Sequence, residues 1–486
     1  MHVLGTWIRP VTLILAAVPL LHAQDGDMAE RLYRSGERAY AAHSYPEALE
    51  TWNQLVAQLP QSPFAARALL SLARHQMDVE KKPEAATPFL EKLKNEYLKT
   101  PQAGDALLLL GRRRAARSHA PADIKEALAD FNRLVDLFPD HPLVQEARLQ
   151  MGLARKLQGE WGRALQAFTE AMRMDPASPA GIAAQLQAAE TLDIMGDLTG
   201  CLRMLQDLRN RHPQAPEAQE AQWRIQVRVL QRLQKPALKS MGPWPQGRTK
   251  WLKTPTLLAT GPEGGLYLYQ SDDDRAYHFK DGALVPSGPV VKGGKALLVP
   301  APGTTWVVSA KFGLVKEDAP QPAAPPLPSP SGGMLDTWGN AWICDPGSQV
   351  IQVLAGDAAP RPLPVPAVQA LAPLPDGGAA AASDATRTLL FLDAAGRTRA
   401  SVPYGKDLPA SFKYVVSLAS DPLGHVAALV DGDFEGVVVW GPDGSVLRSA
   451  TYKTLGIAGK FRAVALDRAG GLILADRSND LLIRLQ

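Results

Sequence analysis

A repeat of about 37 residues runs through the first half of the chain and constrains its fold more than any other feature. Small residues recur at intervals of 37, 42, 37 and 37, at Ala48, Ala85, Ala127, Ala164 and Cys201. A single unit of this kind cannot bury its apolar face alone and must stack on its neighbours. The pattern therefore predicts a solenoid of about five helix pairs over residues 24–235.

Two further repeated positions indicate how the helices would pack. A large apolar residue follows each small one after four positions, at Trp52, Phe89, Phe131, Phe168 and Leu205. Matching small residues lie upstream, on the expected first helix of each pair, at Gly36, Ala73, Gly111, Gly152 and Ala189. The small residues allow two helices to approach closely, and the large ones fill the gap between neighbours. Residues 216–235 are expected to form a final capping helix.

These units resemble the tetratricopeptide repeat, most closely at Gly152, Gly159, Ala164, Phe168, Ala171 and Pro176. Their spacing is similar to that of the repeats in bacterial envelope proteins. The resemblance implies a concave face that binds proteins or peptides. It places seven residues in this groove: Tyr33, Glu37, Tyr40, Arg67, Arg74, Arg112 and Glu190. The arginines have two interpretations, contact with an acidic peptide or solvation on a helix surface.

After residue 235 the pattern changes to short apolar strands separated by glycine turns. The turns recur at intervals of 39, 36, 38, 47 and 46, at Gly264, Gly303, Gly339, Gly377, Gly424 and Gly470. Such spacing is typical of one four-stranded blade per turn. Six units predict an all-β six-bladed propeller over residues 249–486, joined to the helical solenoid by a linker at 236–248.

The last propeller unit resembles the NHL repeat, in which a D-x-x-G turn precedes a strand that ends in Ala-Asp. Asp467, Gly470, Ala475 and Asp476 carry this resemblance. Three strands are predicted in this unit, so closing the ring needs a fourth strand from elsewhere, because closure removes exposed strand edges. Residues 249–254 are the predicted closing strand.

The propeller half offers few groups for chemistry. It contains two histidines, His278 and His425, and therefore no three-histidine zinc site. Six-bladed propellers that this one resembles include lactonases and lyases, but the sequence holds no Ser/His/Asp arrangement and no phosphate-binding glycine loop. Cys201 and Cys344 fall in separate predicted domains, so we expect no disulfide. We predict no catalytic residue, no cofactor and no metal.

Two other sets of propeller residues have both a functional and a structural interpretation. Aspartates at the ends of second strands could bind calcium or bond to their own turns, at Asp345, Asp384, Asp431 and Asp476. Tryptophans could anchor a ligand on a propeller face or pack between blades, at Trp306, Trp338, Trp342 and Trp440. The tryptophans are the candidate binding residues of this half.

The N-terminus has the features of an export signal. Arg9 precedes an apolar run from Val11 to Leu21, which is short for a membrane span. We predict a signal peptide over residues 1–23, a periplasmic or extracellular location and no membrane span after cleavage; an uncleaved anchor is the alternative. Residues 1–240 carry 30 basic and 27 acidic side chains, and residues 241–486 carry 22 of each, so nucleic acid is not an expected partner.

The sequence thus predicts an exported, non-enzymatic scaffold that binds proteins or peptides through a solenoid groove and a propeller face, for example in cell-envelope assembly. One alternative is a propeller hydrolase or lyase with a helical targeting domain. Another is a sensor that binds cell-wall material or carbohydrate. Solenoids and propellers both host many unrelated functions, so the fold alone does not choose among these.

Overall fold

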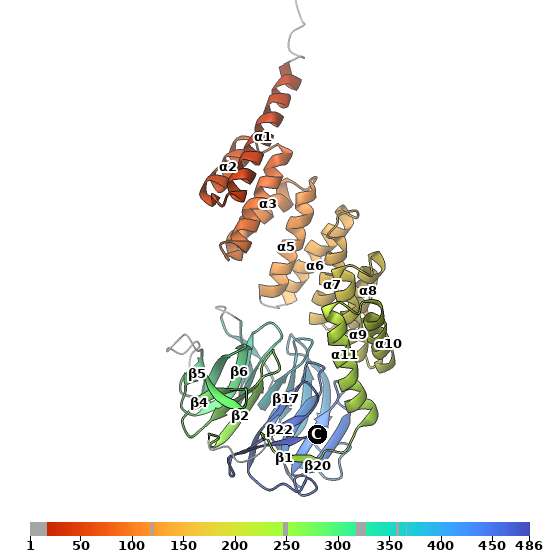
Figure 1. Cartoon of the computed structure of the whole chain (residues 1–486), viewed down its shortest axis with the longest axis vertical. Coiled ribbons are helices and arrows are strands. Elements are labelled where there is room, and N and C mark those ends of the chain that lie inside the picture. The colour runs from red at the N-terminus through yellow and green to blue at the C-terminus, as the bar shows by residue number, and fades with distance from the viewer. Residues whose placement is uncertain (1–16, 118–120, 246–250, 317–326, 356–358, 366) are drawn as a thin grey trace, which may run out of the picture. The chain divides into compact units, whose positions relative to one another are not determined.

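A computed structural model describes residues 17–117, 121–245, 251–316, 327–355, 359–365 and 367–486 (Figure 1). The chain divides into two compact units, residues 1–114 with 126–147 and residues 115–125 with 148–486. In the described residues, a helical repeat region of eleven α-helices precedes an all-β propeller of six blades. Most of the predicted signal peptide, residues 1–16, lies outside the described part of the chain.

The first unit holds the N-terminal helix pairs. Their helices are α1 (Ala17–Ala41), α2 (Tyr45–Gln58), α3 (Pro63–Asp78), α4 (Pro83–Glu96), α5 (Pro101–Arg117) and α6 (Pro121–Leu137). Ser62 caps α3 by accepting a hydrogen bond from the Phe64 amide, and Pro63 occupies the first turn, where no amide donor is needed. The repeated small and large residues meet as expected: a Cβ added at Gly36 would lie 2.3 Å from the Trp52 indole. The same holds for Gly111, at 2.4 Å from Phe131.

The second unit contains most of the remaining helices together with the propeller. The helices are α7 (Val144–Leu157), α8 (Trp161–Met174), α9 (Pro179–Ile194), α10 (Leu198–Arg211), α11 (Pro216–Arg228) and the π-helical turn η1 (Val229–Gln234). A Cβ added at Gly152 would lie 2.3 Å from Phe168, so this pair repeats the packing of the first unit. The expected capping helix forms, but it changes from α-helix to π-helix at Val229 and ends where Lys235 turns left-handed, with φ of 43°.

Each propeller blade is an antiparallel sheet whose strands are ordered outward from the centre of the ring. Blade one is β2 (Pro255–Thr260), β3 (Leu266–Gln270), β4 (Arg275–Lys280) and β5 (Ala283–Val290). Blade two has three strands in the described residues, β6 (Gly294–Ala301), β7 (Thr304–Ser309) and β8 (Gly313–Val315). Blade three is β9 (Gly332–Leu335), β10 (Ala341–Asp345), β11 (Val350–Leu354) and β12 (Arg361–Leu363).

The other three blades complete the ring. Blade four is β13 (Val368–Pro373), β14 (Ala379–Ser383), β15 (Thr388–Leu392) and β16 (Thr398–Pro403). Blade five is β17 (Phe412–Ser420), β18 (Val426–Gly432), β19 (Gly436–Trp440) and β20 (Val446–Thr451). Blade six is β21 (Phe461–Leu466), β22 (Leu472–Asp476), β23 (Leu481–Leu485) and β1 (Ser240–Pro243). The first strands of all six blades contact one another in turn, from β2 through β6, β9, β13 and β17 to β21 and back to β2.

The strand that completes blade six is not the predicted one. Ser240 to Pro243 pairs with Leu481 to Leu485 in place of the predicted closing strand at residues 249–254, of which 251–254 are described. Lys239 and Gln486 extend the pairing by exchanging two backbone hydrogen bonds of 3.0 Å. Pro243 fits here because the outermost strand has one edge without a partner, where a missing amide donor costs nothing.

The glycine turns of blades five and six share one construction. In blade six the Asp467 carboxylate accepts hydrogen bonds from the Ala469 and Gly471 amides, and Gly470 has a φ of 78°. In blade five Asp421 accepts from the Leu423 and His425 amides in the same way. The aspartate satisfies amides that the turn leaves unpaired, and only glycine adopts the left-handed backbone at little cost. These turns place polar groups at one end of the propeller channel.

Candidate functional site

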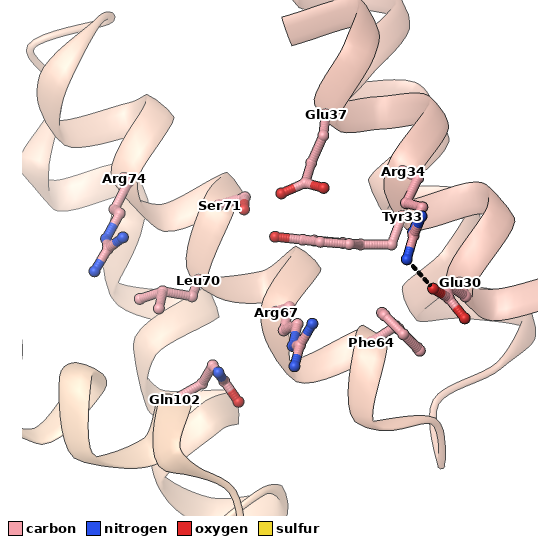
Figure 2. A pocket seen from close by; sticks show the side chains of 10 residues that line it. All are labelled: Glu30, Tyr33, Arg34, Glu37, Phe64, Arg67, Leu70, Ser71, Arg74 and Gln102. Carbon is pink, nitrogen blue, oxygen red and sulfur yellow. Dashed lines mark ion pairs between the residues drawn. The ribbon is translucent and has the colours of Figure 1, made fainter. Parts of the chain in front are cut away.

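A pocket of about 470 Å³ lies between α1, α3 and α5 in the first unit (Figure 2). Its lining residues are Glu30, Tyr33, Arg34, Glu37, Phe64, Arg67, Leu70, Ser71, Arg74 and Gln102. Four of the predicted groove residues therefore come together here: Tyr33, Glu37, Arg67 and Arg74. All the lining helices are first helices of their pairs, which is where the repeat resemblance placed a groove.

Of the three arginines that line this pocket, two have carboxylate partners and one has none among the described residues. Arg34 pairs with Glu30 at 2.5 Å, and Arg74 pairs with Asp105 at 2.8 Å. Arg67 is exposed, its guanidinium lies 5.1 Å from the centre of the Phe64 ring, and no described carboxylate lies within ion-pair distance. A cation over an aromatic ring keeps most of its capacity to bind an anion. Arg67 is thus the pocket's available positive charge.

Tyr33 forms the apolar part of the pocket together with Phe64. Their ring centres are 5.8 Å apart, and the Trp52 ring lies 6.4 Å behind Tyr33. Figure 2 shows the Tyr33 hydroxyl pointing toward Ser71, with Glu37 on one side and Arg67 on the other. Burial raises the pKa of the Tyr33 phenol, and the nearby Glu37 carboxylate raises it further. The phenol is therefore protonated at neutral pH, with the Ser71 and Glu37 side chains as its nearby hydrogen-bond partners.

The other three predicted groove residues lie elsewhere. Tyr40 packs against Tyr45 and Trp52, with ring centres 5.0 and 5.3 Å away, and is not among the lining residues. Arg112 is exposed on α5, also outside the pocket lining. Glu190 belongs to the second unit, where it is buried and accepts contacts from Lys156 at 3.3 Å and from Arg224. The pocket is therefore confined to the N-terminal repeats.

Sequence reasoning missed several lining residues that lie one helical turn from the predicted ones. Glu30 and Arg34 flank Tyr33 on the same helix, and Phe64 and Ser71 flank Arg67. Residues three and four apart lie on one face of a helix. Extending each predicted position by one turn in both directions would have identified all four.

A second cavity, of about 400 Å³, lies inside the propeller ring. The first strands of the six blades form its largely apolar wall, and Thr260, Asp336, Asp421 and Arg468 are among its lining residues near the glycine turns. His425 is buried behind Asp421, with its Nδ1 atom 2.7 Å from the carboxylate. Across the described residues, no group of three or more His, Cys, Asp or Glu side chains is arranged to hold a metal ion.

The four candidate tryptophans do not line this cavity. Trp342 is buried and its indole donates to Asp336 at 3.1 Å, while Trp440 is buried with its ring centre 6.4 Å from that of Phe412. Trp306 is half-buried, with the Lys316 ammonium 4.7 Å from its ring centre. Trp338 is half-buried and fills the space beside Gly377, where an added Cβ would overlap its ring. All four make packing contacts within the propeller.

Three of the four strand-end aspartates accept hydrogen bonds from neighbouring segments of the propeller. Asp345 accepts from the Ser329 amide at 2.9 Å and from the Ser348 hydroxyl at 2.6 Å. Asp384 accepts from the Tyr404 hydroxyl at 2.9 Å, and Asp476 accepts from the Lys460 and Ser478 amides. Asp431 is exposed. Each of the first three therefore has a local structural role.

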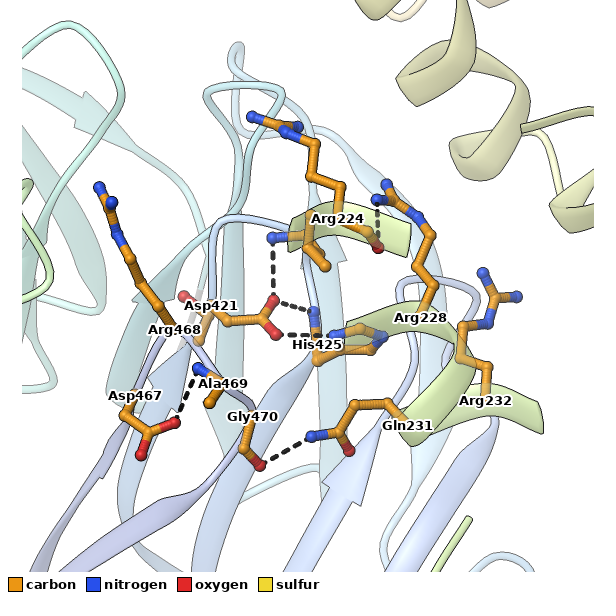
Figure 3. Close-up of polar contacts among 12 residues, drawn as sticks. Arg224, Arg228, Gln231, Arg232, Asp421, His425, Asp467, Arg468, Ala469 and Gly470 are labelled. Carbon is orange, nitrogen blue, oxygen red and sulfur yellow. Dashed lines mark hydrogen bonds and ion pairs between the residues drawn. The ribbon is translucent and has the colours of Figure 1, made fainter. Parts of the chain in front are cut away.

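Within the second unit, α11 and η1 contact the turns of the propeller (Figure 3). The Gln231 amide donates to the Gly470 carbonyl at 2.7 Å, and the Trp223 indole donates to the Arg468 carbonyl. Behind this contact Arg228 pairs with Asp193 at 2.7 Å, and both side chains are 2% exposed. Burial lowers the pKa of the neighbouring Lys156 to about 8, although the Asp376 carboxylate opposes the shift.

No family model and no curated protein sequence matches this chain. Among solved structures, a streptogramin B lyase is 10% identical over 51% of this chain and 97% of its own, with a TM-score of 0.37. A gluconolactonase from Xanthomonas campestris is 16% identical over 48% and 86%, with a TM-score of 0.35. YrrB, a TPR protein with an unusual peptide-binding site, is 20% identical over 43% and 97%, with a TM-score of 0.31. Similarity at this level carries no functional argument.

Proposed function

We propose that this protein is an exported adaptor that binds a segment of a partner protein in the pocket between α1, α3 and α5. The observation that carries the proposal is Arg67, an exposed guanidinium in a concave site with no described carboxylate partner. A carboxylate on the partner supplies the missing charge. A charge-assisted hydrogen bond of this kind is about twice as strong as a neutral one.

The rest of the pocket defines the chemistry of the preferred segment. An apolar side chain beside the acidic residue packs against Tyr33 and Phe64, which supply large apolar surfaces. Glu30 and Glu37 face the same pocket and repel a second acidic residue, while they favour a basic one. The preferred ligand is therefore a segment with one acidic residue between an apolar and a basic neighbour.

The proposed location follows from the N-terminal sequence. The apolar run from Val11 to Leu21 supports export, and within the described helices none is both long and apolar enough to cross a membrane. In this proposal the NHL-like propeller is a second protein-binding module. Its D-x-x-G turns and closed ring support a rigid surface.

The proposal is tested with the full chain in cells. A photo-crosslinking amino acid at Ser71, which lines the pocket, captures the bound segment for mass spectrometry. Arg67→Glu is expected to reduce capture of the main partner at least tenfold, because it replaces attraction with repulsion. Arg112→Glu is the matched control, since Arg112 is an exposed arginine outside the pocket, and capture should change less than twofold. Equal capture by both variants contradicts the proposal.

The second candidate is a propeller that acts on a small molecule. It is favoured by the cavity of about 400 Å³ with Asp421 and Arg468 at its lining. Incubation with a panel of lactones, with and without divalent metal ions, tests for turnover. Turnover that is lost in Asp421→Asn and retained in Arg67→Glu would favour this candidate over the adaptor.

A further inference from the structure

We infer that the propeller is the resident binding partner of the last helical repeats, so that external segments bind the N-terminal repeats alone. The second clause rests on the proposed function, and the first stands on the contacts within the second unit. In this arrangement α11 and η1 bind blade six, while the turn between α7 and α8 binds blade four. The second unit then moves as one body.

The contact with blade six is directed at backbone atoms. Gln231 is fully buried, and its amide donates to the Gly470 carbonyl at 2.7 Å. The same carbonyl also accepts a hydrogen bond of 3.1 Å from Arg448 of blade five. A Cβ added at Gly470 would lie 2.1 Å from the Gln231 nitrogen, so the helix side chain occupies the space that the missing side chain leaves. A turn and a helix that approach this closely are fitted to each other.

The contact with blade four is separate from the first. Arg397, in the turn after β15, donates to the Gln158 carbonyl at 2.9 Å. The Arg399 guanidinium lies 5.5 Å from the centre of the Trp161 ring, at the start of α8. Two attachments on different blades prevent the helices from rotating about either one. The linker is therefore not a hinge between the last repeats and the propeller.

Six charged residues inside the last repeats are already paired with one another. Glu190 holds Lys156 and Arg224, and Asp193 holds Arg228 and Arg232. The side chains of these six residues are between 2% and 13% exposed. Buried and satisfied charges cannot exchange partners without a large cost. They contrast with Arg67, which is exposed in the N-terminal pocket and has no described carboxylate within ion-pair distance.

Cutting the backbone between the helices and the propeller tests whether the noncovalent contacts alone hold the two parts together. A protease site inserted between Pro236 and Ala237 lets the folded full chain be cut after η1 and before β1, which leaves β1 in the propeller fragment. The two fragments are expected to co-elute at one-to-one stoichiometry in size-exclusion chromatography at micromolar concentration. Separation of the wild-type fragments, with both keeping their circular dichroism spectra, would overturn the inference.

A variant with Trp223→Phe, Gln231→Leu and Arg397→Ala removes the three backbone-directed donors. After cutting, the dissociation constant of its two fragments should be at least 30-fold higher than that of the wild-type fragments. An unchanged dissociation constant contradicts the inference. Capture at Ser71 in the uncut triple variant should be unchanged. This separates the two proposals, because loss of docking with retained capture leaves the proposed function intact.

Hydrogen exchange on the uncut wild-type chain provides a measurement that needs no variant. The turn at 467–471 and the turn at 336–340 have the same two backbone hydrogen bonds and the same two amide bonds to their first aspartate, but the contacts of Trp223 and Gln231 are made to the turn at 467–471. Amides at 467–471 should exchange at least tenfold more slowly. Equal exchange in the two turns contradicts docking.

Discussion

Equivalent positions of the repeat have different roles at the two ends of the solenoid. Glu37 and Glu190 each follow the small residue of a first helix, at Gly36 and Ala189. Glu37 is exposed and faces the N-terminal pocket, whereas Glu190 is buried and holds Lys156 and Arg224. The repeat determines where a side chain lies on its helix. Its surroundings, either solvent or the packed interior of the second unit, determine what the side chain does. The following predictions test this difference, beginning with the largest effect.

The strongest contrast is between two arginines. Arg228→Ala leaves the buried Asp193 carboxylate with fewer partners and should lower the free energy of unfolding of the second unit by about 3–5 kcal/mol. Arg67→Ala removes an exposed side chain and should change stability by less than about 0.5 kcal/mol. Urea unfolding followed by circular dichroism measures both. Similar losses would remove the distinction between a buried and an available arginine.

The pH dependence of stability tests the burial of Lys156. Its pKa is about 8 in the folded chain and 10.5 as a free side chain, so the unfolded chain binds more protons between these values. The second unit should therefore gain stability as the pH rises from 8 to 10, by about 2 kcal/mol. In Lys156→Met, the free energy of unfolding should not show this increase between pH 8 and pH 10. An unchanged slope in the variant would show that Lys156 is solvated.

Two glycines with matched backbones isolate the helix contact. Gly470 and Gly339 have φ of 78° and 82°, so alanine at either position should cost about 1–2 kcal/mol in backbone strain. An added Cβ meets Gln231 at Gly470 and nothing within 4 Å at Gly339. Gly470→Ala should therefore cost about 1 kcal/mol more than Gly339→Ala. Thermal unfolding of both variants measures the difference, and equal costs would argue against the contact.

The smallest effect is expected at the pocket itself. Tyr33→Phe removes a half-buried hydroxyl and should change stability by less than about 0.5 kcal/mol. Tyr404→Phe is the comparison, because its buried hydroxyl bonds to Asp384 at 2.9 Å and its loss should cost about 1 kcal/mol. Capture at Ser71 should fall a few-fold in Tyr33→Phe and stay the same in Tyr404→Phe. A larger loss of stability in Tyr33→Phe than in Tyr404→Phe would contradict the prediction, because it would make Tyr33 the tyrosine whose hydroxyl stabilises the fold.

The fold was predictable because its packing positions repeat. Gly36 with Trp52 and Gly152 with Phe168 occur at fixed spacings, and their contacts are set by the geometry of two adjacent helices. The glycine turns likewise mark the blades, since a left-handed backbone selects glycine at each one. Local rules of this kind are visible in one sequence.

Other features depend on residues far apart in the chain. The strand Ser240–Pro243 contains Gly242 and Pro243, which disfavour strands, and it forms because Leu481 to Leu485 offers a free edge. Glu190 has the same place in its repeat as Glu37, and its burial follows from Lys156 and Arg224 on other helices. Sequence register brought Tyr33, Glu37, Arg67 and Arg74 to one pocket but could not identify which charges were already paired.

The closing strand also has a consequence for synthesis and assembly. Ser240–Pro243 leaves the ribosome about 240 residues before its pairing strand, Leu481–Leu485. At about 5–20 residues per second, the growing chain carries this unpaired segment for tens of seconds. A glycine and a proline in such a short segment make it a poor template for aggregation while it waits. The glycine and proline of Ser240–Pro243 disfavour a strand, and they therefore suit a segment that stays unpaired until the last blade has been synthesised.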